Sequence, residues 1–271
     1  MPVSLAPALV QSHPFRQWRS WNLPGRDITL TGYSRANDKT FFHVPQLKLA
    51  LDAGLVEGRR PPTVLLTHTH LDHAKDLDFL AVRPGGADIY VPAESLEYVH
   101  AHLRATTELN QVAAFDPALA EGTRLHGVHS GDEFTFGKRG TYTARVVPCR
   151  HKVPSVGYVI GDGRRTLFAY VGDTHASALA EADWLDGVPV VITECTFLDD
   201  ADLERAARIG HTVWSELRPI VEAHPETLFV LIHFSLRHSD AEVVDFFAAA
   251  DLPNIVVWAG TDGLLPQQNG I

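Results

Sequence analysis

The chain carries four side chains with metal-binding chemistry within six consecutive positions: His68, His70, Asp72 and His73. Imidazole nitrogens and carboxylate oxygens held close together are the ligands that zinc prefers in proteins. One tetrahedral catalytic ion would not take four ligands from a single loop and still keep a position for water. The spacing therefore suggests two metal ions. The alternative is a solvated histidine-rich turn, which would suit a lone histidine better than this arrangement.

The residues on either side of this stretch place it between a strand and a helix. An apolar run over 63–66 follows Pro61-Pro62 and predicts a short buried strand. His68 and His70 are two positions apart, so they can face the same way in an extended turn. Residues 74–80 then predict a helix. A strand–loop–helix context adds weight to a metal-binding motif.

Apolar and alternating patterns predict the other elements of the chain. Strands are expected over 26–33, 40–51, 88–91, 188–193, 227–233 and 254–258, and a run of strands over 123–161 continues through a tight Asp162-Gly163 turn to residue 168. Helices are expected over 93–106, 176–182, 202–209, 213–223 and 240–250. No linker, low-complexity tract or repeat divides the sequence, so we expect one domain over residues 1–271.

Three further candidate ligands lie at the ends of expected strands: His151, Asp173 and His233. A histidine or aspartate in such a position is more often a cap or a turn residue. Three of them could be presented to one site, because strands that end at the same sheet edge bring the following side chains together.

Composition limits the class of protein and its compartment. Of 271 residues, 45% are hydrophobic and 21% are charged, which is typical of a globular protein with a sizeable core. Cys149 and Cys195 are the only cysteines, so a disulfide framework is excluded and the cytoplasm is expected. No run approaches the ~20 apolar residues of a membrane span. The net charge of −10 counts against a large basic surface for RNA but not against a local one.

The motif H-x-H-x-D-H after a buried strand resembles the signature of the metallo-β-lactamase superfamily. Four later segments resemble its ribonuclease Z branch, the tRNA 3′-processing endonucleases: HKVPSVGYVI (151–160), TECTFLDD (193–200), GHTVWSEL (210–217) and HFSLRH (233–238). The resemblance runs from about residue 31 to residue 238. It implies an α/β fold, a four-layer αββα sandwich with the helices outside, and the two β-rich stretches followed by helices are compatible with it.

The resemblance also implies a complete set of seven ligands for two zinc ions. One zinc would be held by His68, His70 and His151, the other by Asp72, His73 and His233, and Asp173 would bridge them. Iron or manganese could occupy the same ligands. Asp52, in the LDAG sequence after the strand over 40–51, would orient metal ligands from behind.

In the family, a pair equivalent to Glu194 and His211 lies beside the metal ions and assists phosphate binding or protonation of the leaving oxygen. Asp72 would serve additionally as a general base. Ser235 and Arg237 would line the same rim, with Arg237 as a fork for phosphate. The plainer interpretations are that His211 begins a helix after Gly210 and that Arg237 is a surface arginine.

The chain departs from the family pattern at one clear place. Ribonuclease Z chains carry a long, flexible, basic arm that grips tRNA, between the segments corresponding to His151 and Asp173. Here the interval is 173 − 151 = 22 residues, and a hairpin occupies it. The family's Gly-Leu after the histidine cluster is also changed, to Asp76-Leu77. Without the arm, small phosphodiesters such as cyclic nucleotides are open as substrates beside tRNA.

The expected activity is therefore that of a two-zinc phosphodiesterase of ribonuclease Z type, in which a metal-bound hydroxide attacks phosphorus. The substrate would be RNA, with tRNA 3′ trailers as one candidate, or a small nucleotide, and the resemblance implies a homodimer. An acyl hydrolase acting on a lactone, thioester or β-lactam with the same metal site is the first alternative. A non-catalytic binding module stabilised by metal is the second, and the intact ligand set argues against it.

Overall fold

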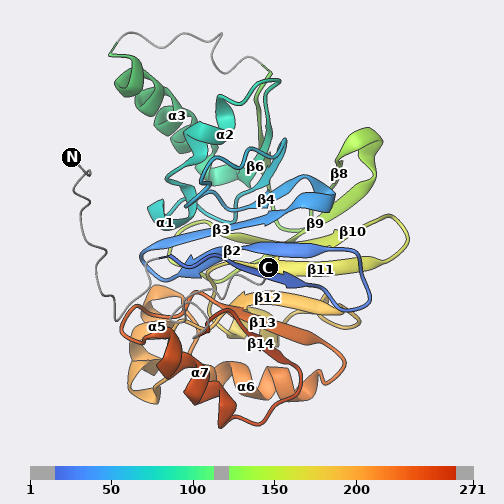
Figure 1. The fold of residues 1–271 in the computed structure, drawn as a ribbon, viewed down its shortest axis with the longest axis vertical. Coiled ribbons are helices and arrows are strands. Elements are labelled where there is room, and N and C mark those ends of the chain that lie inside the picture. Colours follow the sequence, from blue (N-terminus) through green and yellow to red (C-terminus); the bar gives the residue numbers. More distant parts are fainter. Residues whose placement is uncertain (1–15, 113–121, 261–271) are drawn as a thin grey trace, which may run out of the picture.

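The computed structural model describes residues 16–112 and 122–260, and these form two β-sheets that face each other with helices on their outer sides (Figure 1). The order of layers is helix, sheet, sheet, helix. This confirms the predicted four-layer αββα sandwich.

The first sheet is built from the amino-terminal half of the chain and its strands lie in sequence order. Its first four strands pair antiparallel, and the pairs from β4 onward are parallel. The strands are β1 (Arg19–Asn22), β2 (Thr29–Arg35), β3 (Lys39–Val44), β4 (Leu49–Leu51), β5 (Thr63–Leu65), β6 (Asp88–Pro92) and β7 (Arg124–Val128).

The second sheet repeats this plan with the following residues. Its strands β8 to β11 pair antiparallel, and β11 to β14 pair parallel. The strands are β8 (Glu133–Phe136), β9 (Tyr142–Pro148), β10 (Val156–Gly161), β11 (Thr166–Val171), β12 (Val190–Glu194), β13 (Leu228–Ile232) and β14 (Ile255–Val257).

Helices cover the outer face of each sheet. The first sheet carries α1 (Leu71–Ala74), α2 (Leu77–Ala81) and α3 (Leu96–Gln111). The second carries α4 (Ser177–Ala180), α6 (Trp214–Ala223) and α7 (Asp240–Ala248), with α5 (Leu203–Ile209) beside them. Ser239 and Glu242 form a capping box that starts α7. In the described ranges, no helix has the length and apolar character of a membrane span.

A hydrophobic core between the two sheets holds them together. Phe42 of β3 lies at its centre and is fully buried. Its ring meets Tyr170 of β11 and Trp258 edge to face, with ring centroids 6.0 Å and 5.2 Å apart. Such aromatic pairs stabilise beyond the area that they bury. The contact therefore joins strands that lie more than a hundred residues apart in sequence.

Several expected elements have different boundaries in the structure. The strand expected over 40–51 is divided into β3 and β4 by a 3₁₀ turn at Pro45–Leu47. The prediction of a single helix over 74–80 was wrong, because α1 and α2 are separated at Asp76. The backbone amide of Asp76 donates to Ala53 instead of continuing the first helix. The short strand β1 was not predicted.

The hairpin that takes the place of the family's arm is confirmed. β10 and β11 fill most of the interval between His151 and Asp173 and are joined by a turn at 162–165. Asp162 closes the turn because its side chain accepts hydrogen bonds from the backbone amides of Arg164 and Arg165 at 3.0 Å and 3.1 Å.

Replacing Phe42 tests the contact between the sheets. Phe42→Ala should lower the free energy of unfolding by about 3–5 kcal/mol, because a fully buried ring is lost and a cavity remains. Urea denaturation measures this change. Leu109→Ala, at an exposed position of α3, should change it by less than about 0.5 kcal/mol. A loss below about 1 kcal/mol for Phe42→Ala would show that this contact does not join the sheets.

Candidate metal centre

The predicted ligands meet at one edge of the sandwich, where strands from both sheets end. The histidine cluster follows β5 of the first sheet, and His151 follows β9 of the second. β11, β12 and β13 run parallel and end side by side, so Asp173, Glu194 and His233 arrive at the same edge. Ligands commonly lie beyond the carboxyl ends of parallel strands. All seven predicted ligands are brought together here.

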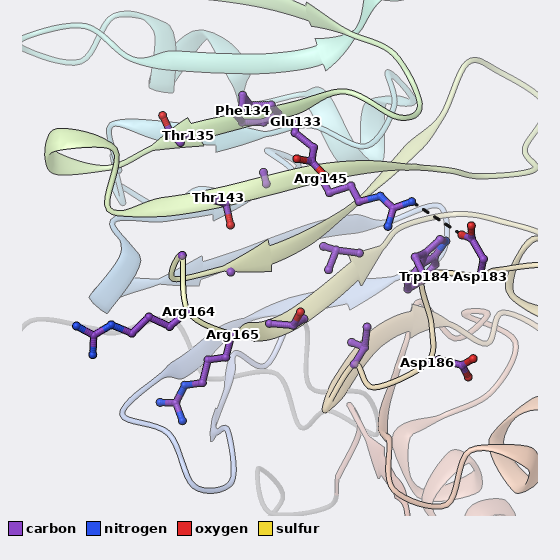
Figure 2. Close-up of a pocket in the computed structure, with 16 residues that line it drawn as sticks. Glu133, Phe134, Thr135, Thr143, Arg145, Arg164, Arg165, Asp183, Trp184 and Asp186 are labelled. Carbon is purple, nitrogen blue, oxygen red and sulfur yellow. Dashed lines mark ion pairs between the residues drawn. The ribbon is translucent and has the colours of Figure 1, made fainter.

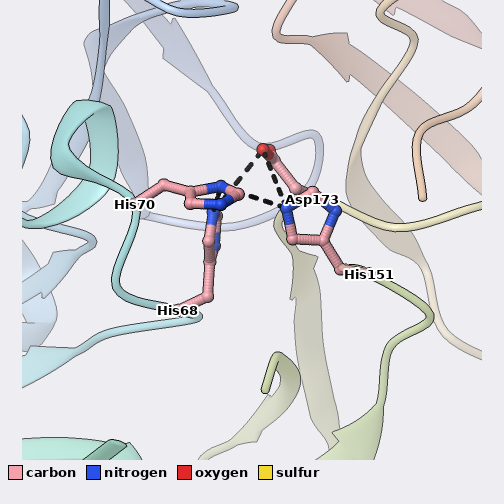
Figure 3. Close-up of side chains that lie close together, drawn as sticks. All are labelled: His68, His70, His151 and Asp173. Atoms are coloured by element: carbon pink, nitrogen blue, oxygen red, sulfur yellow. Dashed lines mark hydrogen bonds and ion pairs between the residues drawn. The ribbon is translucent and has the colours of Figure 1, made fainter. Parts of the chain in front are cut away.

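One group consists of His68, His70, His151 and Asp173, whose ligand atoms lie within 4.8 Å of one another (Figure 3). His70 Nδ1 is 3.1 Å from Nε2 of His68 and 3.1 Å from Nε2 of His151. These side chains come from two different sheets and point toward one another. Three imidazoles and one carboxylate in such a cluster can hold a metal ion.

The second group consists of Asp72, His73 and His233. His73 Nε2 and His233 Nε2 are 3.3 Å apart, and His233 Nε2 is 3.5 Å from Asp72 Oδ2. His73 and His233 are almost fully buried, and Asp72 is partly exposed. The cluster is therefore open to solvent on the side of Asp72.

Asp173 lies between the two groups, and its two oxygens face different ones. Oδ2 is 3.6 Å from His68 Nε2 and 3.9 Å from His151 Nε2. Oδ1 is 3.3 Å from His73 Nε2 and 3.4 Å from His233 Nε2. Oδ1 is also buried without a hydrogen bond. A carboxylate placed in this way can bridge two cations.

Two of the histidines are fixed with their free nitrogen facing the cluster. His151 Nδ1 donates to the carbonyl oxygen of Gly210 at 2.8 Å. His73 Nδ1 donates to Asp52 Oδ2, also at 2.8 Å. Each Nε2 is then the atom available to a ligand. Metal-binding histidines are oriented in this way by a partner of the other ring nitrogen.

Two threonine hydroxyls fix two more histidines. Thr67 Oγ1 donates to Asp52, so it accepts from His68 Nδ1 at 3.0 Å. Thr196 Oγ1 donates to the carboxylate of Glu194, so it accepts from His233 Nδ1 at 3.1 Å. Four Nε2 atoms therefore converge around Asp173. The donor set fits a cation between these atoms.

Burial and neighbouring charges set the protonation of the cluster. Burial lowers the pKa of His68 far below its usual value and also lowers the pKa of His70 and His151. Burial would raise the pKa of Asp72, but His233 and His73 outweigh it and bring that pKa to about 2. Burial would lower the pKa of His73, but Asp173 and Asp52 raise it well above normal. The two carboxylates thus favour a positive charge at His73, either as a proton on its ring or as a cation bound to Nε2.

Asp52 supports the cluster from behind, in the place that its predicted orienting role requires. It is fully buried and accepts from Thr67 N at 2.7 Å, from Thr67 Oγ1, from His73 Nδ1 and from the hydroxyl of Tyr170. Its φ of 58° and that of His233, 62°, lie in the left-handed region. Such conformations cost about 1–3 kcal/mol and persist where surrounding contacts enforce them.

Gly54, the glycine of the LDAG sequence, allows two backbone segments to approach each other closely. A Cβ at this position would lie 1.8 Å from the carbonyl oxygen of Asp72 and 2.8 Å from that of Thr40. The turn therefore packs backbone against backbone on α1. Ala53 N donates to the carbonyl oxygen of His73 at 2.6 Å. Only glycine allows this approach, which fixes the helix that carries Asp72 and His73.

Glu194 and His211 form a pair beside the cluster, as predicted. Glu194 is fully buried, and its oxygens accept from His211 Nδ1 at 2.8 Å and from the backbone amides of Thr174 and Thr212. His211 stacks on His233 with an angle of 18° between the rings. Burial would lower the pKa of His211, but Glu194 outweighs it and raises it to about 9. Glu194 can reach a substrate only through His211.

Ser235 and Arg237 contact each other and residues other than the metal ligands. The guanidinium of Arg237 donates to Asp202 Oδ2 and lies 5.4 Å above the ring of Phe197. Ser235 Oγ accepts from the amide of Arg237 at 3.3 Å. Binding of phosphate by Arg237 stays a prediction, and it would require the guanidinium to leave Asp202.

The turn between β2 and β3 has a role at the site that sequence reasoning missed. Asn37 N donates to Asp72 Oδ2 at 3.0 Å. Arg35 is 6% exposed, donates to the carbonyl oxygen of Ser235 at 3.0 Å and pairs with Asp240 at 2.9 Å. Arg35 and the turn after it thus tie Asp72 to the loop after β13, which follows His233. The Asn37-Asp38 dipeptide signals a turn, but nothing in the sequence identifies its partners.

A separate cavity of about 790 Å³ lies at the opposite end of β9, β10 and β11 (Figure 2). Arg145 points toward Asp183 in this cavity, while Arg164 and Arg165 extend away from it. It contains none of the predicted site residues. The candidate metal ligands therefore lie at the carboxyl ends of the strands and not in this cavity.

The chain is similar in sequence and in fold to known proteins. Residues 38–234 match the family model described as the beta-lactamase superfamily domain. The chain is 25% identical over 284 residues to tRNase Z TRZ2, chloroplastic, of Arabidopsis thaliana, with 89% of this chain and 78% of that protein covered. The metallo-β-lactamase fold protein YhfI of Bacillus subtilis superposes with a TM-score of 0.62 at 16% identity, covering 84% and 94% of the two chains. The short form of human tRNase Z gives 0.52 at 18%, covering 87% and 91%.

Neutralising the carboxylate of Asp52 tests whether it holds the metal ligands in place. Asp52→Asn should weaken zinc binding by about 10–100-fold, because the residue no longer holds His73 and Thr67 as a carboxylate does. Titration of the metal-free protein with zinc, in competition with a chromogenic chelator, measures the affinity. Asp183→Asn removes an exposed carboxylate far from the cluster and is the matched control. An affinity for Asp52→Asn within twofold of the control would contradict this role.

Proposed function

The chain belongs to the β-lactamase superfamily, and from this we propose that it is a two-metal phosphodiesterase of the ribonuclease Z type. It is a metal-dependent hydrolase. The Arabidopsis relatives are tRNase Z proteins, which directs the proposal to RNA. Zinc as the cation, a homodimer and a cytoplasmic location stay predictions.

The two ligand groups would hold one cation each. His68, His70 and His151 would bind the first with Asp173 Oδ2, and Asp72, His73 and His233 the second with Asp173 Oδ1. Zinc suits this mixture of imidazole and carboxylate, and iron or manganese share the preference. Bound there, the cations would stabilise charge on phosphate oxygens and lower the pKa of a water molecule.

Asp72 is placed to act as a general base. Its Oδ2 accepts from the backbone amide of Asn37, which fixes the side chain. Among the residues described, none donates a hydrogen bond to Oδ1. This oxygen is free to accept a proton from an attacking water. A base must lie within hydrogen-bond reach of the proton that it removes, and Asp72 is on the open side of the cluster.

The observation that carries the proposal is the position of His211. Its Nδ1 is committed to Glu194 at 2.8 Å, and Nδ1 lies 4.0 Å from Asp173 Oδ2. Within the described ranges, Nε2 of His211 has no partner, and the side chain is 13% exposed. A proton held on Nε2 can be given to a leaving alkoxide. Departure of a ribose oxygen from phosphorus needs such an acid.

Two substrates with different leaving groups test this role of His211. The metal-loaded protein should cleave both bis(p-nitrophenyl) phosphate and a precursor tRNA with a 3′ trailer. His211→Gln should lower kcat for the RNA by about 10²–10⁴-fold, because a ribose oxygen leaves poorly without a proton. The loss on the nitrophenyl ester should be much smaller, since nitrophenolate leaves unprotonated. Steady-state kinetics measures both losses.

His68→Ala should abolish both activities, and His100→Gln, at an exposed position of α3, should change neither. Equal losses on both substrates for His211→Gln would show that His211 is not the acid. Turnover of a thioester or lactone, with none of either phosphodiester, would contradict the proposed function and favour the acyl hydrolase.

A further inference from the structure

A basic pocket borders the metal centre. Its volume is about 410 Å³, and it is lined by Arg150, His151, Lys152, His175, Arg208 and Gly210, together with three small residues. No carboxylate lines it. The chain as a whole has a net charge of −10. A pocket lined by three cationic side chains and no carboxylate therefore differs from the overall charge of the protein. Such local charge determines which ligands approach.

His151 is the wall that the basic pocket shares with the metal centre. Its Nε2 lies 3.1 Å from His70 Nδ1 in the cluster, and its Nδ1 donates to Gly210. Gly210 ends α5 at φ 74°, and a Cβ there would lie 2.6 Å from His151 Cα. The end of α5 is thus pressed against the loop after β9. This contact brings Arg208 and Lys152 to the border of the cluster.

The cations of the basic pocket differ in how they are neutralised. Arg150 forms an ion pair with Glu181, and His175 lies 3.3 Å from Glu216. Lys152 and Arg208 make no side-chain hydrogen bond or ion pair with any residue of 16–112 or 122–260. Both are exposed. Their charges are therefore available to an anionic ligand.

A second cavity, of about 330 Å³, also touches His151 and Cys149. It is lined by the apolar side chains of Pro92, Val128, Pro148, Val153, Pro154 and Val156 and by the polar side chains of Glu94, His129, Ser130 and Ser155. Ligand sites combine apolar walls with a few polar groups that fix the orientation of the ligand. The loop after β9 thus borders a basic pocket, this second cavity and the metal centre.

We propose that the basic pocket binds the phosphate next to the scissile one, while the second cavity receives a base, so that the substrate is a single nucleic-acid strand. This rests on the proposed function of the metal centre. Phosphate contacts from lysine and arginine hold a strand in register, and the guanidinium of Arg208 can bind phosphate as a fork. A diester without a neighbouring phosphate would leave the pocket empty.

Binding of a strand that resists cleavage tests the proposal without relying on turnover. The probe is fluorescein-labelled hexauridylate with phosphorothioate linkages, followed by fluorescence anisotropy with the metal-loaded protein. Lys152→Ala/Arg208→Ala should raise Kd at least tenfold. The slope of log K against log salt should become shallower by about 0.7, the value for one phosphate contact in a single strand. Lys152→Arg/Arg208→Lys keeps both charges and should restore most of the binding.

Lys138→Ala/Arg164→Ala is the matched control. It removes two exposed charges at the other end of the second sheet, and Kd should stay within twofold. Steady-state kinetics on two substrates gives a second test. For Lys152→Ala/Arg208→Ala, the ratio of kcat/KM for an RNA hexamer to that for bis(p-nitrophenyl) phosphate should fall at least tenfold, with most of the change in KM.

Three results would overturn the proposal: no change in Kd for Lys152→Ala/Arg208→Ala, an equal loss in the control, or competition by uridine monophosphate as strong as that by the strand. The last would identify a pocket for a free nucleotide instead. If the proposed function is wrong, the same experiments would give a different result. The strand would then bind in the predicted charge-dependent way, but the wild-type protein would cleave no phosphodiester.

Discussion

The buried carboxylate of Asp173 is the constraint on which the rest of the structure depends. Its oxygens face four imidazole nitrogens from two sheets, and Oδ1 has no hydrogen bond. A buried charge is costly unless it is paired. Cations in the two groups would pair it. The sandwich brings two sheet edges together at this residue, and the surrounding hydrogen bonds hold each imidazole with its Nε2 inward.

Around the metal centre, the neighbouring residues determine which substrate would bind. Glu194 is fully buried and accepts from His211 Nδ1, so it fixes that ring and leaves Nε2 without a partner among the described residues. On the other side of His151, the loop after β9 carries Lys152, which has no ion-pair partner among the described residues, next to a second cavity. The turn that contains Arg35 and Asn37 then joins the first sheet to the loop after β13.

The resemblance to the metallo-β-lactamase superfamily predicted the four layers and grouped the seven candidate ligands, whereas local patterns predicted most of the individual strands. Buried strands are recognisable from apolar runs, and the side chains that follow them must meet at a sheet edge. The supporting residues were harder to predict. Tyr170 reaches Asp52 from 118 positions away, and the hydroxyls of Thr67 and Thr196 look like any others in the sequence. The partner of Arg237, Asp202, also depends on tertiary packing. The division of the helix expected over 74–80 arises from a hydrogen bond to Ala53 that no local pattern reveals.

We expect this cluster to hold two cations, one on each side of Asp173. The most direct measurement is anomalous diffraction at the zinc edge from crystals of protein supplied with zinc. Two peaks are expected, about 3.5–4 Å apart, one beside His68, His70 and His151 and the other beside Asp72, His73 and His233. The Asp173→Asn variant should lose at least one of them. A single peak, or none, in the wild-type protein would show that the cluster does not hold two cations.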